Sequence, residues 1–277
     1  MNPDFGTKHL VGLAWLLSLI AIVLVVLLVV KKKKNLGADF DRAVIRYTCY
    51  FMWAWEFVKT VVMVNADQPG GGYGPIGYYP LWMAPFHICS MGLYAYLIVG
   101  AKRPGKLAEW VNPFAYASLM IVTSIILIIP GSASLLGIVE DWSFCYDNIL
   151  PYQTWLYHGS LLFVSIYMVA SGFYRPKWSD IYKAGAVLCV VAAGAQALNY
   201  IFDGSNADYM TLRYGRGNPF VFLLEGDTPV LYYIVLSAVA IGGTAVIITI
   251  TKLITDLINK SKGAESCAEE SKAEMTV

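Results

Sequence analysis

Residues 9–30 read HLVGLAWLLSLIAIVLVVLLVV and are followed at once by four lysines, Lys31 to Lys34. A helix of about 20 apolar residues is long enough to cross the hydrocarbon core of a bilayer. The run is too long for the strand of a membrane barrel, and it lacks the alternation of such a strand. The lysines follow the apolar run instead of preceding it, so we do not expect a cleaved signal peptide. These residues predict a membrane-spanning helix.

The composition of the whole chain agrees with this prediction. Of its 277 residues, 57% are hydrophobic and 14% are charged, whereas a soluble domain has about 25% charged residues. A formal net charge of +1 gives no electrostatic basis for binding nucleic acid. Aromatic residues make up 14% of the chain, which argues against disorder over most of its length. We therefore expect an integral membrane protein.

Seven apolar stretches are long enough to span a membrane. We expect an all-α fold with seven transmembrane helices in a single domain, residues 1–250. The predicted spans are His9–Val30, Ala43–Val64, Pro80–Val99, Val111–Ile129, Gln153–Phe173, Asp180–Phe202 and Pro229–Ile250. Residues 251–277 have mixed charge, and we expect them to form a partly disordered tail.

The distribution of Lys and Arg predicts the orientation. Thirteen of these residues lie beside the span ends that would share one side of the membrane, and three lie on the other side. Because cytoplasmic connections are enriched in Lys and Arg, we expect the N-terminus outside and the C-terminus in the cytoplasm. The protein would then be a multi-pass protein of the cell membrane, with its long connections outside. Long ordered loops often carry function.

Polar side chains occur at a common depth in the outer half of four predicted spans. Glu56, for example, lies roughly 12 Å below the outer end of its helix, at about 1.5 Å per residue. Such groups are costly in a bilayer and therefore face the interior of a helix bundle by default. The set consists of Glu56, His87, Cys89, His158, Gln196 and Asn199. We expect these side chains to line one cavity that opens toward the outside.

Some of these groups also have structural interpretations. Glu56 and Lys59 are spaced i,i+3 and can neutralise each other as an ion pair. Gln196 and Asn199 share a helix face and can hydrogen-bond to neighbouring helices. The sequence leaves both interpretations open.

Cys89 and His158 are the candidates for covalent chemistry. A cysteine nucleophile needs a base to form its thiolate, often a histidine within hydrogen-bond reach. His87 is two residues from Cys89, about 200° around a straight helix, so His158 on another helix is the better base. A cysteine in a membrane span can equally be a small packing residue. Five cysteines and three dispersed histidines form neither a disulfide framework nor a metal-ligand pattern, and we expect no metal and no cofactor.

Several short motifs occur in order along the chain. They are Pro85-Phe86-His87-Ile88-Cys89-Ser90, His158-Gly159, Asn199-Tyr200, the segment from Asn206 to Leu212 and the segment from Gly226 to Tyr233. Together they resemble the YwaF-like bacterial integral membrane proteins and their eukaryotic relatives, the transmembrane protein 164 family. The resemblance extends from about Arg42 to Ile250. It implies a multi-pass fold and acyl transfer to lysophospholipids through a cysteine acyl-enzyme, with Cys89 as nucleophile, His158 as base and Asn206 among the substrate contacts.

Two functions are compatible with these residues. The first is a membrane-embedded lipid acyltransferase or lipid hydrolase, in which Asn199 or Gln196 would donate a hydrogen bond to the oxyanion. The second is a non-catalytic binding protein or transporter for a small polar ligand or lipid headgroup. The sequence shows neither an inverted repeat nor paired broken helices, the features that favour a transporter. We expect membrane lipids, including a lysophospholipid, as partners.

Overall fold

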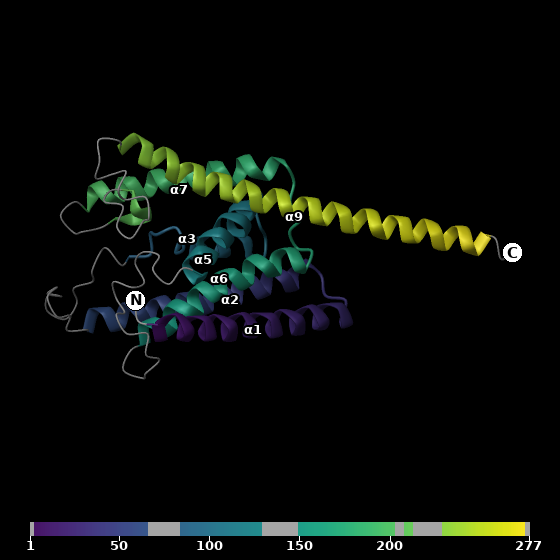
Figure 1. Ribbon diagram of the computed structural model, residues 1–277, viewed down its shortest axis with the longest axis horizontal. Helices are drawn as coiled ribbons and strands as arrows, with labels where there is room; N and C mark the ends of the chain where they lie inside the picture. The colour runs from purple at the N-terminus through teal and green to yellow at the C-terminus, as the bar shows by residue number, and fades with distance from the viewer. Residues whose placement is uncertain (1–2, 66–83, 129–148, 203–207, 213–228, 275–277) are drawn as a thin grey trace.

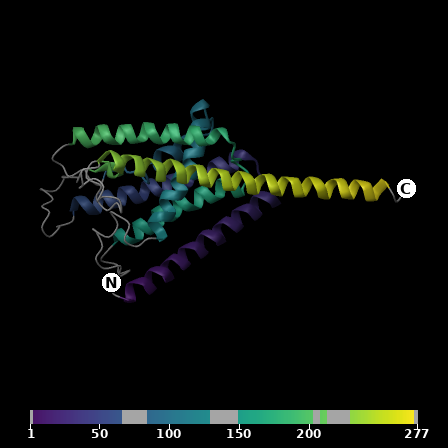
Figure 2. The same ribbon diagram turned by 45° about the horizontal axis from the view of Figure 1, so that its top comes forward.

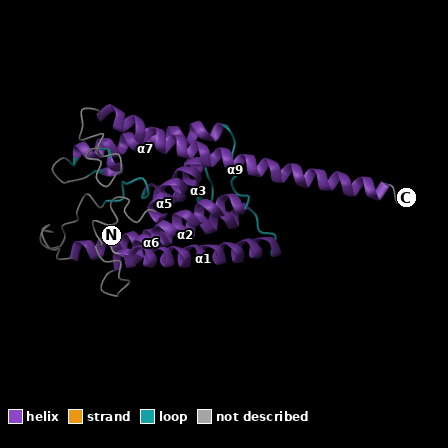
Figure 3. Cartoon of the chain, in the orientation of Figure 1, coloured by secondary structure: helices purple, strands orange, loops and turns teal. Residues whose placement is uncertain are grey.

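The computed structural model describes residues 3–65, 84–128, 149–202, 208–212 and 229–274. Within these ranges every regular element is a helix (Figure 3), as the apolar runs predict. The elements are α1 (Pro3–Lys33), α2 (Ala38–Asn65), α3 (Met91–Val99), α4 (Lys106–Pro113), the π-helical η2 (Phe114–Ser118), α5 (Leu119–Ile128), α6 (Ile149–Ala170), α7 (Ser179–Ile201), the 3-10 turn η4 (Tyr209–Thr211) and α9 (Pro229–Glu274).

The long helices lie side by side along the long axis of the molecule (Figure 1). α6 packs against α1, α2 and α5, and α7 packs against α4 and α9. α1 leans away from the other helices toward its N-terminal end (Figure 2). α9 extends well beyond the bundle at its C-terminal end in both views. The bundle is therefore held together mainly around α6, which carries His158.

Within the described ranges, four helices are long and apolar enough to cross a membrane. They are Leu10–Lys33, Lys106–Ile128, Ser179–Ile201 and Val230–Ser261. The second of these combines α4, η2 and α5 into one continuous helix. α2 and α6 lie at two further predicted spans and carry more polar side chains. The structure thus shows several apolar helices, while the total of seven spans and their orientation stay predictions.

The third predicted span, Pro80–Val99, differs from the observed structure. Residues 84–90 form successive turns, and α3 begins only at Met91. Pro85 accounts for a break at Ala84, because its ring lacks an amide hydrogen and disfavours helical geometry at the preceding residue. The nine residues of α3 rise only about 14 Å, far less than the roughly 30 Å of a hydrocarbon core.

α9 continues without a break to Glu274, past the apolar run that ends at residue 250. The domain boundary at residue 250 and the partly disordered tail stay predictions. No proline follows Pro229 in this helix, and Lys, Leu, Glu and Ala are frequent after residue 250. These residue types have high helix propensity, which explains why the helix extends beyond the apolar run.

Buried polar contacts join three helices at one end of the bundle. The Lys31 ammonium, near the end of α1, donates to the Asp41 carboxylate of α2 at 2.6 Å and to the Ser171 carbonyl after α6 at 2.7 Å. The Tyr167 hydroxyl donates to the other Asp41 oxygen at 2.7 Å. We call this region, defined by Lys31, Asp41, Tyr167 and Ser171, the basic end. It fixes the ends of α1 and α6 against the start of α2.

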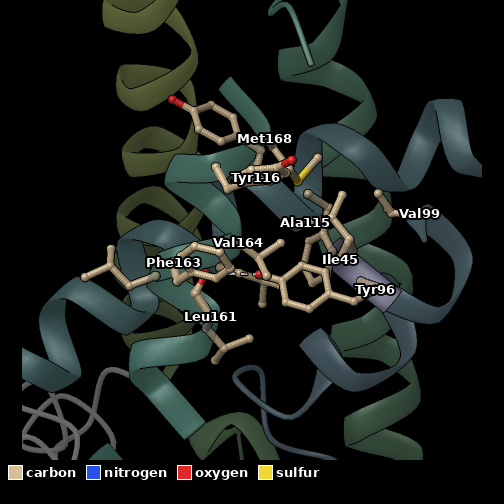
Figure 4. Packing of buried hydrophobic residues seen from close by; sticks show 14 of the residues in the cluster. Ile45, Tyr96, Val99, Ala115, Tyr116, Leu161, Phe163, Val164 and Met168 are labelled. Carbon is tan, nitrogen blue, oxygen red and sulfur yellow. Dashed lines mark hydrogen bonds between the residues drawn. The ribbon is translucent and has the colours of Figure 1, made fainter. Parts of the chain in front are cut away.

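The core lies between α2, α3, α6 and the π-helical segment (Figure 4). Tyr96 of α3 is fully buried, and its hydroxyl donates to the Leu161 carbonyl of α6 at 3.1 Å. η2 begins directly after Pro113, and π turns of this kind leave backbone carbonyls without helical partners. Ser165 of α6 donates to one of them, the Ala115 carbonyl, at 3.5 Å. This packing gives α6 a fixed position relative to α2 and α3.

Candidate active site

The turn segment, residues 84–90, carries both His87 and Cys89. It leads into α3 through close hydrogen bonds, from the Gly92 amide to the Cys89 carbonyl at 3.1 Å and from the Leu93 amide to the Ser90 carbonyl at 3.0 Å. Irregular backbone is tolerated at membrane depth only where protein or a cavity covers it. The side chains of the turn segment do not follow helical spacing, so the sequence does not predict in which direction each of them points.

Cys89 is half-buried and lies near the charged pair of α2. The Glu56 carboxylate is 2.5 Å from the Lys59 ammonium, and both side chains are largely buried, with 5% and 12% exposed. Both charges are close enough to the Cys89 thiol to interact with it electrostatically, and the Ser90 hydroxyl lies beside the sulfur. The ion pair expected from the i,i+3 spacing is therefore present, and it belongs to the surroundings of Cys89.

His158 and Cys89 share one charged neighbour, because the Lys59 ammonium acts electrostatically on both the His158 ring and the Cys89 thiol. The Nδ1 atom of His158 is 2.8 Å from the Thr154 carbonyl. A carbonyl only accepts, so in the neutral ring Nδ1 carries the hydrogen and Nε2 carries the free lone pair. Nε2 is buried and has no hydrogen-bond partner among the residues that the structure describes. The hydrogen bond expected between Cys89 and His158 is thus not made in this structure.

His87, Gln196 and Asn199 gather around Tyr209 instead. The rings of His87 and Tyr209 meet edge to face with centroids 5.4 Å apart. Fully buried Asn199 accepts from the Tyr209 amide at 2.7 Å and donates to the Tyr209 carbonyl at 3.1 Å, while its contact with Gln196 is longer, at 3.4 Å. Burial raises the pKa of Tyr209 to about 12, so its hydroxyl stays protonated near neutral pH. Asn199 therefore holds the 208–212 segment in place, as the structural interpretation of this residue suggested.

The predicted site residues consequently form two groups. Glu56, Cys89 and His158 lie toward α2 and α6, and His87, Gln196 and Asn199 lie toward α7. His87 and Cys89 have different neighbours in this structure. Asn206 lies outside the described residues.

Two open pockets flank the turn segment. One of about 280 Å³ contains the Glu56 side chain, and one of about 350 Å³ lies between the turn segment and α7. The walls of the first pocket are Trp53, Glu56, Phe57, Thr60 and Pro85. A mostly apolar wall with one buried carboxylate suits a ligand that has both a hydrocarbon part and a polar part.

A comparison with protein families completes the description of this bundle. The model of the TMEM164 family matches residues 5–249. The chain belongs to the TMEM164 family. Comparisons with curated proteins and with solved structures gave no match. Membership of the TMEM164 family confirms that part of the resemblance, whereas the likeness to YwaF-like proteins stays a prediction.

In this member of the TMEM164 family, sequence reasoning missed Tyr157 and Ser90. Tyr157 directly precedes His158 in α6, its ring is 3% exposed, and it lies near Cys89 and Ser90. Tyrosine is common at the membrane interface, so its presence in a span gave no signal. Its position next to His158 was the only hint. In the described ranges, no group of three or more His, Cys, Asp or Glu could hold a metal ion.

Proposed function

We propose that this member of the TMEM164 family is a membrane-embedded lipid acyltransferase or lipid hydrolase with Cys89 as its nucleophile. One observation carries the proposal. A half-buried cysteine and a buried imidazole are both within electrostatic range of the Lys59 ammonium, and the Nε2 lone pair of that imidazole has no partner in the described part of the chain. Leaving such an atom buried and unpaired is unfavourable, and a proton acceptor for the thiol is the role that fits it.

The reaction would proceed in two steps, acylation of Cys89 and then attack on the resulting thioester. His158 Nε2 takes the thiol proton, the sulfur bonds to the ester carbonyl carbon, and the carbonyl electron pair moves to oxygen. When the ester C–O bond breaks, His158 returns the proton to the leaving alkoxide, and a thioester on Cys89 remains. A lysophospholipid hydroxyl, or water in a hydrolase, then attacks the thioester. His158 accepts the proton of that hydroxyl and returns it to the thiolate.

The tautomer of His158 supports this role. The Thr154 carbonyl holds the ring hydrogen at Nδ1, so Nε2 is the basic nitrogen before the reaction starts. Catalytic hydrogen bonds are often long in unliganded sites and tighten when substrate binds. The turn segment can make this adjustment more easily than a continuous helix, because fewer of its backbone groups are fixed in a regular hydrogen-bond ladder.

The substrate class follows from the surroundings of the site. The two pockets beside the turn segment are mostly apolar, and a membrane phospholipid is the ester that most readily enters such pockets in a helical bundle. With the N-terminus outside and seven spans, the site lies in the outer half of the cell membrane and opens outward. The Glu56–Lys59 pair would face the polar headgroup region.

One observation favours a second function. The first pocket combines aromatic walls from Trp53 and Phe57 with the Glu56 carboxylate, an arrangement that also suits reversible binding of a cationic or zwitterionic headgroup. In that case the protein would be a non-catalytic binding protein or transporter for a small polar ligand or lipid headgroup. No covalent adduct would then form on Cys89.

Turnover in lipid vesicles separates the two functions. The purified protein is reconstituted with a labelled phospholipid and an unlabelled lysophospholipid, and acyl exchange and fatty acid release are both measured. We expect turnover that Cys89→Ser and His158→Ala abolish. Cys49→Ser is the matched control, because the Cys49 thiol is buried in the core and donates to the Leu93 carbonyl at 3.2 Å. Lipid binding without turnover in the unchanged protein would support the second function.

A further inference from the structure

Tyr157 has a buried hydroxyl that the fold does not use. The side chain is 3% exposed, and its oxygen has no hydrogen-bond partner within the described ranges. Other deeply buried tyrosines have partners. The Tyr96 hydroxyl donates to Leu161, and the Tyr167 hydroxyl donates to Asp41. Burying a hydroxyl without a partner is unfavourable by comparison with a phenylalanine of the same shape. Packing alone therefore does not explain a tyrosine at this position.

The hydroxyl lies close to Ser90, the residue that follows the proposed nucleophile. It is next to the Ser90 hydroxyl, without the geometry of a hydrogen bond, and it is within electrostatic range of the Cys89 thiol and the Glu56 carboxylate. The ring is fixed edge to face against the imidazole of His158, with centroids 5.5 Å apart. Tyr157 is thus a rigid donor on the same helix as the proposed base.

Acyl transfer through a cysteine requires a donor at this place. Attack on the ester moves an electron pair to the carbonyl oxygen, and hydrogen-bond donors that are already in position stabilise the resulting oxyanion. We expected Asn199 or Gln196 to supply such a donor. The Asn199 amide already donates to the Tyr209 carbonyl and also contacts the Gln196 side chain. These amides belong to the group around Tyr209 instead of the surroundings of Cys89.

We propose that the Tyr157 hydroxyl donates the hydrogen bond that stabilises the oxyanion formed during attack by Cys89, an inference that rests on the proposed function. The hydroxyl keeps its proton throughout. It shortens its hydrogen bond as negative charge develops on the substrate oxygen and relaxes when the C–O bond breaks. Protons still move only between Cys89, His158 and the leaving or attacking hydroxyl. Tyr157 thereby stabilises the transition state by a hydrogen bond and forms no covalent bond to the substrate.

Two reactions of the same thiol test this role. Acylation of Cys89 by a phospholipid or an activated acyl ester passes through an oxyanion, whereas alkylation by iodoacetamide displaces iodide from a saturated carbon and forms none. For Tyr157→Phe we expect acylation to slow about a hundredfold, the usual effect of losing one oxyanion donor. Alkylation should stay within about twofold of the unchanged protein. The thermal unfolding midpoint should stay the same or rise, because the variant removes an unpaired buried hydroxyl.

Tyr96→Phe is the matched control. It removes a buried hydroxyl that has a structural partner, so it should lower the unfolding midpoint and leave the ratio of the acylation rate to the alkylation rate unchanged. Equal slowing of both reactions in Tyr157→Phe, or no slowing of either, would overturn the inference. If the unchanged protein acylates a residue other than Cys89, or none, the proposed function itself is contradicted, and the two failures are therefore distinguishable.

Discussion

Asn199 and His158 are both buried polar residues near the same end of the bundle, yet their atoms are used differently. The amide oxygen and nitrogen of Asn199 both have backbone partners on Tyr209. His158 uses one ring nitrogen on Thr154 and leaves the other without a partner among the described residues. At the scale of single residues, a buried polar atom with no partner is therefore the feature that separates candidates for chemistry from structural residues.

Asn199→Ala tests the structural role of the first residue. The change removes both hydrogen bonds that Asn199 makes with the Tyr209 backbone, so we expect the free energy of unfolding to fall by about 1–3 kcal/mol. Thermal or denaturant unfolding in detergent micelles measures the effect. Gln196→Ala is the control and should cost much less, because its hydrogen bond to Asn199 is long, at 3.4 Å. Equal losses in the two variants would contradict this assignment.

Glu56→Gln tests the charged pair. The substitution removes the carboxylate 2.5 Å from the Lys59 ammonium, and breaking a buried pair in this way costs about 3–5 kcal/mol. The double variant Glu56→Gln/Lys59→Met should recover most of that stability, because it removes both charges. Unfolding measurements on the two single variants and the double variant give the coupling between the residues. Additive effects would show that the pair does not stabilise the fold.

The turn segment decides where the site lies at the scale of secondary-structure elements. In a continuous helix, His87 and Cys89 would be placed by helical spacing, about 200° apart. In the observed turns one of them meets Tyr209 and the other lies near Glu56 and Lys59. The position of Cys89 thus depends on α3 being held firmly against its neighbours.

Gly100 provides a test of how α3 is held. A Cβ at this position would lie 2.9 Å from the Arg46 amide nitrogen, so α3 could not approach α2 this closely. We expect Gly100→Ala to lower the free energy of unfolding by about 1–3 kcal/mol, as overpacking does. Gly105→Ala is the matched control, because a Cβ there meets nothing within 4 Å. Unfolding in detergent compares the two variants, and equal stability would contradict the close contact.

The helices could be predicted from the sequence because each long apolar run can satisfy its backbone hydrogen bonds internally only as a helix. The turns at residues 84–90 could have been anticipated from Pro85, but their course depends on contacts with Tyr209 and α2 that sequence spacing does not contain. The ion pair was predictable because Glu56 and Lys59 are neighbours on one helix. Tyr157 was not, since its importance comes from a missing partner and from residues far away in the sequence.

At the scale of the whole molecule, the basic end brings Lys31 and Asp41 together with the end of α6. The Lys252 ammonium of α9 lies over the Trp178 ring, 5.7 Å from its centroid, at the start of α7. These contacts agree with short, basic connections on a common side of the bundle. Since Lys and Arg concentrate on the cytoplasmic side, we expect the basic end to face the cytoplasm.

Two of the chain's own cysteines test this orientation. Cys145 lies in a predicted outside connection, whereas Cys267 lies far along α9 on the predicted cytoplasmic side. In variants that keep only one of them, a membrane-impermeant maleimide applied to intact cells should label Cys145 and not Cys267. After the cells are opened, both should react. Labelling of Cys267 in intact cells would reverse the predicted orientation.

Mass spectrometry of the Cys89 peptide tests the central claim most directly. The folded protein is incubated with phospholipid vesicles, digested and analysed, with the Cys49 peptide as an internal control. The proposed mechanism predicts that the Cys89 peptide gains the mass of one acyl chain and that neutral hydroxylamine removes it, as expected for a thioester. A Cys89 peptide that stays unmodified in folded protein would contradict nucleophilic catalysis and leave Cys89 as a packing residue.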